Sequence, residues 1–151
     1  MALRLSEGTR DAIMNAFDTA FANGIIDIYS GSQPATADAA ETGTKLARIT
    51  LASGAFTPGV GTNGLNFDTA ADGSIAIDSG EVWSGVGLAA GTAGWFRFYD
   101  NAATAGASTS AVRFDGVCGV GTGELRLSSL TVAVGATISV DSATITQPAS
   151  A

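Results

Sequence analysis

The pattern of apolar and polar positions changes once along the chain, close to Gly24. Before it, apolar residues recur at the one, four, seven and eight spacing of a single helix face. Ser6 is a favourable N-cap residue, and Asn23 followed by Gly24 supplies the left-handed stop. The pattern predicts one amphipathic helix over residues 6–23, whose apolar face consists of Ile13, Met14, Phe17, Ala20 and Phe21.

After Gly24 apolar and polar residues alternate with a period near two, which is typical of strands with one buried face. Runs of this kind are separated by Asn-Gly, Asp-Gly and similar pairs that close tight turns. Short strands at such spacing favour an antiparallel sandwich or barrel over a parallel sheet. The predicted strands cover residues 25–29, 46–51, 64–67, 74–77, 81–88, 95–99, 111–117, 124–127, 130–134 and 137–146.

We expect a single domain over residues 1–151, because chains of roughly 100 to 200 residues usually bury one core. The expected fold is mainly β: a jelly-roll-like antiparallel β-sandwich over residues 24–147, of about ten short strands, preceded by the helix. Two stretches of small polar residues, 30–44 and 101–110, interrupt the alternation. They are predicted to be long surface loops, the part of a fold that often carries contacts.

Five of the seven cations are arginines placed between two apolar residues. In a strand, Arg97 would share one face with Trp95 and Tyr99, while Phe96 and Phe98 occupy the other. Ordinary alternation, with each arginine facing water, explains such a pattern. Alternatively, adjacent strands bring the arginines together in a positive, partly aromatic face that docks against carboxylates of a partner subunit. The candidate interface residues are Trp95, Arg97, Tyr99, Arg113, Arg126 and Arg48.

The charge balance and the residue types exclude several function classes. Seven cations against fourteen anions argue against nucleic-acid binding, which needs clustered Lys and Arg. The chain has no histidine and one cysteine, so histidine-based catalysis, histidine metal sites and thiolate zinc sites are excluded. We expect Cys118 to be a small buried residue, and we expect no cofactor and no enzymatic activity.

Three apparent chemical motifs have simpler interpretations. The glycine-rich stretch 116–124 is followed by strand patterns, whereas a phosphate-binding loop opens a helix. The stretch 68–74 has two aspartates and a glycine but lacks the alternating oxygen ligands of a calcium loop, and we interpret it as a hairpin turn. Paired carboxylates for glycoside hydrolysis stay open from sequence, although the aromatic residues outside 95–99 are scattered.

The chain contains no run of about 18 apolar residues, and its first residues, MALRLSEGTR, lack the parts of a secretory signal. We therefore expect no membrane insertion and synthesis in the cytoplasm.

Several stretches, taken together, resemble a known family. They are LSEGTRDAIMNAF, IIDIYSGSQPATADAAETGTKLARITL, AGWFRFYDN, AVRFDGVCGVGTGELRLSS and the ending ATISVDSATITQPA. This set resembles small tailed-bacteriophage and prophage proteins found among virion structural genes, and the resemblance covers nearly the whole chain. It implies a component of the virion, made in the cytoplasm of a bacterial host, and it brings no catalytic motif.

The expected function is accordingly a non-enzymatic structural one, most concretely a capsid decoration (cement) protein that stabilises the phage head through subunit contacts. Expected partners are the major capsid protein or other virion subunits and further copies of the chain, with neither nucleic acid nor membrane. The helix, or the tail after Thr146, would pack on a neighbour as an exchanged arm. Two alternatives stay open: a tail tube, tail tip or fibre-base subunit, and a host-glycan attachment module in which Trp95 and Tyr99 stack on sugars.

Overall fold

The computed structural model describes residues 3–149, and its first element is the predicted helix, α1 (Glu7–Phe21). Ser6 is the N-cap, and its hydroxyl accepts a hydrogen bond from the backbone N–H of Thr9. The chain leaves the helix through Asn23, whose φ of 57° is the left-handed conformation that ends many helices. The predicted helix is confirmed, although Ile13 and Ala20 of its predicted apolar face are exposed.

Nine strands follow within the described residues, and they coincide with nine of the ten predicted runs. The exception is the run 64–67, which forms isolated bridges from Leu65 to Gly24 and from Phe67 to Ile77. The strands are β1 (Ile25–Ser30), β2 (Lys45–Leu51), β3 (Ser74–Ala76), β4 (Trp83–Val86), β5 (Gly91–Tyr99), β6 (Arg113–Gly119), β7 (Leu125–Leu127), β8 (Thr131–Val132) and β9 (Thr137–Thr146).

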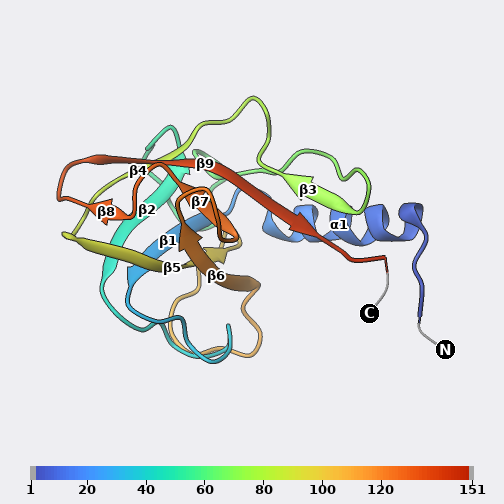
Figure 1. Ribbon diagram of the computed structural model, residues 1–151, viewed down its shortest axis with the longest axis horizontal. Coiled ribbons are helices and arrows are strands. Elements are labelled where there is room, and N and C mark those ends of the chain that lie inside the picture. Colours follow the sequence, from blue (N-terminus) through green and yellow to red (C-terminus); the bar gives the residue numbers. More distant parts are fainter. Residues whose placement is uncertain (1–2, 150–151) are drawn as a thin grey trace.

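Seven of the described strands close into a barrel, in the order β1, β2, β4, β9, β7, β6, β5 and back to β1 (Figure 1). The expected β-sandwich is therefore wrong, although the fold is mainly β with one helix. The pairing that decides this is β1 with β5, because it joins the two ends of the sheet. Closure removes most of the unpaired edges that two separate sheets would leave, although β7 joins β6 to β9 over only a few residues.

The barrel is antiparallel except between β6 and β7, where Cys118 and Gly119 pair in parallel with Leu125 and Arg126. β8 pairs with the beginning of β5, and β3 pairs with the last residues of β9.

Aromatic side chains fill the barrel interior. The Phe98 ring lies at its centre, stacked on Phe67 and Phe114 with ring centroids 5.3 and 5.2 Å apart. From α1, Phe21 meets Phe98 edge to face at 5.5 Å and so fastens the end of the helix to the core.

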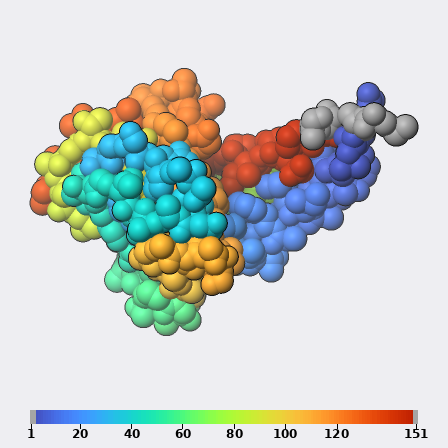
Figure 2. All heavy atoms as spheres, turned by 90° about the horizontal axis from the view of Figure 1, so that it is seen from below, coloured from blue at the N-terminus to red at the C-terminus, as the bar shows by residue number. Residues whose placement is uncertain are grey.

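The rest of α1 extends beyond the barrel together with β3 and the end of β9, and we call these three segments the stem (Figures 1 and 2). Polar side chains of α1 hold it to the turn before β3: Asp11 accepts a hydrogen bond from Gly73 N–H at 2.6 Å, and Asn15 accepts one from Ala70 N–H at 3.0 Å. The molecule is therefore a barrel with one projecting stem.

Candidate functional site

The outer face of the barrel wall formed by β2, β1, β5 and β6 carries most of the predicted interface residues. Four charged residues lie directly opposite one another across these strands. Asp27 pairs with Arg48 on one side and with Arg97 on the other, and Arg97 pairs in turn with Asp115. Their signs alternate across the row, and neighbouring opposite charges stabilise a sheet.

Arg97 lies at the centre of this face, next to the Trp95 and Tyr99 rings, with its guanidinium carbon 5.5 Å from the Trp95 ring centroid. Its Nε and Nη2 donate to the two carboxylate oxygens of Asp115 at 2.6 and 2.7 Å. Its Nη1 donates to Glu41 Oε1 at 2.9 Å. The side chain is completely buried, with 0% of its surface exposed, so its partners belong to its own chain.

The two long loops, which connect β1 to β2 and β5 to β6, cover Arg97. Arg113 ties them together, because its Nη1 donates to the carbonyl of Gly106 at 2.6 Å and its Nη2 to that of Asp38 at 3.0 Å. Ser108 N–H also donates to the carbonyl of Asp38 at 2.9 Å. We call the group of Glu41, Arg97, Tyr99, Arg113 and Asp115 the loop clamp.

Within the loop clamp, the Glu41 carboxylate contacts Arg97, Tyr99 and Arg113. Burial disfavours its charged form, but hydrogen bonds from the Tyr99 hydroxyl at 2.7 Å, from Gly106 N–H and from Arg97 outweigh burial and lower its pKa to about 2. Burial in turn raises the pKa of Tyr99, whose hydroxyl stays a proton donor. The carboxylate is therefore ionised across the physiological pH range.

A second ion-pair group lies at the other end of the charge row. The buried Asp27 carboxylate accepts hydrogen bonds from Arg48 Nε at 2.7 Å, from Arg48 Nη2 at 2.8 Å and from Lys45 Nζ at 2.7 Å. Arg48 and Lys45 are both about one-third exposed, at 33% and 37% of their side-chain surface. This group borders solvent, whereas the loop clamp is enclosed.

The prediction that this face is open to a partner subunit is wrong for Trp95, Arg97, Tyr99 and Arg113, which are all buried beneath the loops. Sugar stacking is excluded for the same reason, because the Trp95 ring lies against Tyr29 with centroids 4.6 Å apart and neither Trp95 nor Tyr99 has a free face. The cause is intramolecular charge pairing: Asp115 and Glu41 take the positions that a partner's carboxylates were expected to occupy.

Arg126 is exposed on β7, away from the other five predicted residues, and it takes no part in the loop clamp. Cys118 is buried, as its prediction stated. Burial, with a smaller effect of the nearby Glu124 charge, raises the pKa of its thiol to about 12, so the thiol is protonated and unreactive at neutral pH.

The sequence interpretation missed three acids, Asp27, Asp115 and Glu41. Asp27 lies between Ile26 and Ile28 and has the same apolar flanks as the arginines. A search for acidic residues between two apolar residues, like the one that found the arginines, would have identified Asp27. Glu41 has no such signal, because it comes from a loop 56 residues before Arg97.

The loop clamp holds the two long loops against the barrel wall. Most of its polar groups bond to one another or to loop carbonyls. The residues from 3 to 149 contain no cluster of three acidic or cysteine side chains that could hold a metal ion. No described helix is long and apolar enough to cross a bilayer. Comparison with family models, with curated proteins and with solved structures finds no match to this chain.

Exposed apolar side chains lie elsewhere, on loops and strands of the barrel such as Val82, Leu88 and Val134, and at one position of α1. Of the fifteen residues of α1, all of them described, Met14 and Phe21 are the buried ones. Ile13 exposes 42% of its surface at the edge of the helix face that packs on the barrel, one turn before the half-buried Phe17. Small exposed side chains accompany it on the helix: Thr9, Ala12, Ala16 and Ala20.

Proposed function

We propose that the chain is a non-enzymatic structural subunit of a tailed-phage particle, most concretely a decoration protein that binds the outside of the capsid. The observation that carries this proposal is the stem. A helix in a protein owes most of its stability to the apolar face that it buries, and α1 buries two of its fifteen described residues. A helix this open gains from a second surface, and a capsid lattice supplies one.

The exposed side of α1 suits close contact with another protein. Ile13 provides one large apolar group, and the alanines around it let a partner backbone approach closely. The stem also projects from the barrel, so that a partner can reach it without meeting the barrel wall (Figure 2).

The loop clamp supports the same role by making the barrel a fixed shape. Loops that are fastened by buried ion pairs lose little conformational freedom when a subunit docks, which lowers the cost of binding. A subunit that binds the assembled lattice and not its free parts stabilises the lattice by mass action, and many copies multiply the effect. No chemical step is needed.

The test is a binding titration of the purified protein against capsids that lack it. We expect saturable binding, and we expect Ile13→Asp to weaken it by at least about tenfold, the range of a central interface residue. Val134→Asp is the matched control, because Val134 is 69% exposed on the turn between β8 and β9 in the barrel part of the molecule. Both variants should melt close to the wild type.

Failure of the wild type to bind would overturn the proposal. Equal binding by Ile13→Asp and Val134→Asp, or weaker binding by Val134→Asp, would show that the stem is not the surface that binds the capsid.

A tail tube or tail tip subunit is the second candidate. It is favoured by the last residues of β9, which pair with β3 on one side and, beyond Ala143, with no described strand on the other. Tube subunits form rings by strand addition and stay assembled without a capsid. A large, stable ring of purified protein that does not bind capsids would select this function.

A further inference from the structure

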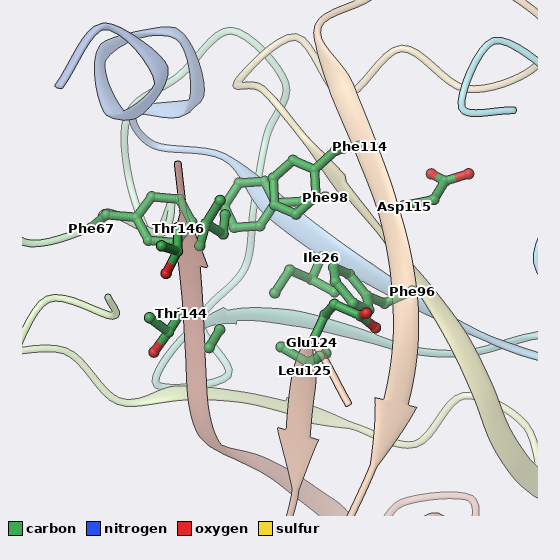
Figure 3. A pocket seen from close by; sticks show the side chains of 12 residues that line it. Ile26, Phe67, Phe96, Phe98, Phe114, Asp115, Glu124, Leu125, Thr144 and Thr146 are labelled. Atoms are coloured by element: carbon green, nitrogen blue, oxygen red, sulfur yellow. The ribbon is translucent and has the colours of Figure 1, made fainter. Parts of the chain in front are cut away.

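The barrel wall has an open seam between β6 and β9, where no described strand lies between them (Figure 3). β7 fills the place between these strands only from Leu125 to Leu127. Because β7 pairs with Cys118 on β6 and with Ala143 on β9, the two edges are two strand spacings apart there, roughly 9 to 10 Å. One further strand has room to continue the line of β7.

The backbone groups on both sides of the seam point into it. On β6, the Val112 carbonyl bonds to Asp100 on the β5 side, and Val117 N–H bonds to Glu124 on the other side. Since these groups alternate along a strand, the N–H and C=O of Asp115 point into the seam.

The same reasoning applies to β9. Ala143 and Gln147 bond to the β3 side, through Ile77 and Gly73. The alternation therefore turns the N–H and C=O of Thr144 and Thr146 toward the seam. Both strand edges therefore present backbone N–H and C=O groups that pair with no described strand.

An apolar cavity of about 280 Å³ lies behind the seam. Four phenylalanine rings form much of its wall, together with Leu125 and Ile145 (Figure 3). Phe17 of α1 packs on Phe114 at 5.3 Å, beside this cavity. The cavity is the space that an inward side chain of one more strand would fill. The four rings are those of Phe67, Phe96, Phe98 and Phe114.

The polar groups around the opening favour a cation. Glu124, Thr144 and Thr146 are among the residues that line the cavity, and no lysine or arginine is among them. Asp115 also lines it, but its carboxylate is bound to Arg97, so Glu124 is the acid that an incoming strand would meet. The Glu124 carboxylate caps Val117 N–H through one oxygen at 2.9 Å. An incoming strand is therefore expected to carry an apolar side chain inward and a basic one outward.

We propose that the segment Leu3–Arg4–Leu5 of a second copy enters the seam as an added strand. Its alternation matches the seam, with the leucines inward and Arg4 outward beside Glu124. In the described chain Leu3 is 73% exposed and Arg4 is exposed, although Arg4 forms a β-bridge and Leu5 N–H donates to the carbonyl of Ala149. Such a contact is head to tail, so it generates rings or chains of subunits.

A synthetic peptide of residues 1–8, MALRLSEG, provides the first test. Added to the full-length protein, it should shift the amide NMR signals of residues 113–117 and 144–146 saturably. A peptide with Leu3→Asp and Leu5→Asp should cause no such shifts, and Glu124→Gln, which keeps the cap on Val117, should weaken binding severalfold. Absence of shifts at the seam, or equal shifts with both peptides, would overturn the proposal.

The second test uses proline, which removes one backbone donor. In Thr144→Pro the lost N–H points into the seam, so the monomer should keep its melting temperature while peptide binding and concentration-dependent self-association, measured by light scattering, fall at least tenfold. In the control, Ile145→Pro, the lost N–H points toward β3, and the melting temperature should fall instead. Unchanged association in Thr144→Pro would refute the added strand.

Strand addition at the seam does not depend on where the subunit lies on a particle. If Thr144→Pro abolishes self-association and still binds capsids, the seam and the decoration function are separate properties. If the wild-type protein binds the peptide and does not bind capsids, the decoration function is refuted, and strand addition at the seam is still supported.

Discussion

Arg97 is an internal residue of this fold because its own chain provides the carboxylates that it needs. Strand alternation correctly predicts the face on which it lies and the two rings beside it. The burial of that face could not be predicted, because it depends on Glu41, which reaches Arg97 from a distant loop. A guanidinium removed from water needs paired acids, and Asp115 and Glu41 together satisfy that need.

Replacement of Arg97 by alanine should lower the free energy of unfolding by about 3 to 5 kcal/mol, because it leaves two carboxylates in the clamp without their cation. Arg126→Ala, on an exposed part of β7, should change it by no more than about 0.5 kcal/mol. Urea denaturation of the three proteins measures both values. A loss below about 1 kcal/mol for Arg97→Ala would mean that the clamp adds little stability.

Glu41 gives the clamp a defined acid sensitivity. Its pKa is lowered to about 2 in the folded chain from an ordinary value of 4.5, so its contribution is complete above pH 4.5 and is lost as the pH falls toward 2. The melting temperature of the wild type should therefore decrease across this interval. Glu41→Gln should be less stable at pH 7 and should lose less between pH 4.5 and 2; parallel curves for the two proteins would contradict this assignment.

Cys118 should resist alkylation. Because burial raises its pKa to about 12, iodoacetamide at pH 8 should modify the folded protein at least a hundredfold more slowly than the protein in urea. Mass spectrometry of timed samples follows the reaction. Equal rates in the two conditions would show that this end of β6 opens readily.

At the scale of elements, local patterns predicted the helix and nine of the ten strands. The run 64–67 failed because its apolar residues, Leu65 and Phe67, are buried without a continuous ladder around them. Burial alone produces the alternation that sequence interpretation takes for a strand.

The connection between α1 and β1 depends on Gly24. A Cβ atom there would collide with the carbonyl oxygen of Tyr99 and would come 2.8 Å from that of Phe21. Gly24→Ala should therefore destabilise the protein strongly, by several °C or more in melting temperature.

Gly8 is the matched control, since it lies in α1 with nothing within 4 Å of an added Cβ. Gly8→Ala should leave stability unchanged or raise it by about 0.4 to 1 kcal/mol. If thermal denaturation shows that both alanines are tolerated equally, Gly24 is not the constraint proposed here.

At the scale of the whole molecule, nine of the ten predicted strands are present, but the predicted β-sandwich is wrong because the strands form a barrel. What separates the two folds is the register of β1 on β5, a contact between residues about 70 positions apart that no local pattern encodes. The stem was predicted only as a helix and two separate strands. These segments lie together outside the barrel because β3 pairs with β9 and α1 is hydrogen-bonded to the turn before β3.

The central claim is that the stem attaches a clamped barrel to the outside of a capsid. Electron cryo-microscopy of tailed-phage particles incubated with the purified protein tests it most directly. The predicted result is repeated density on the outer surface of the head that fits the barrel, with α1 against the capsid and the barrel pointing away from it. Density for the subunit in the tail, or a capsid contact made by the barrel with α1 free in solvent, would contradict the account.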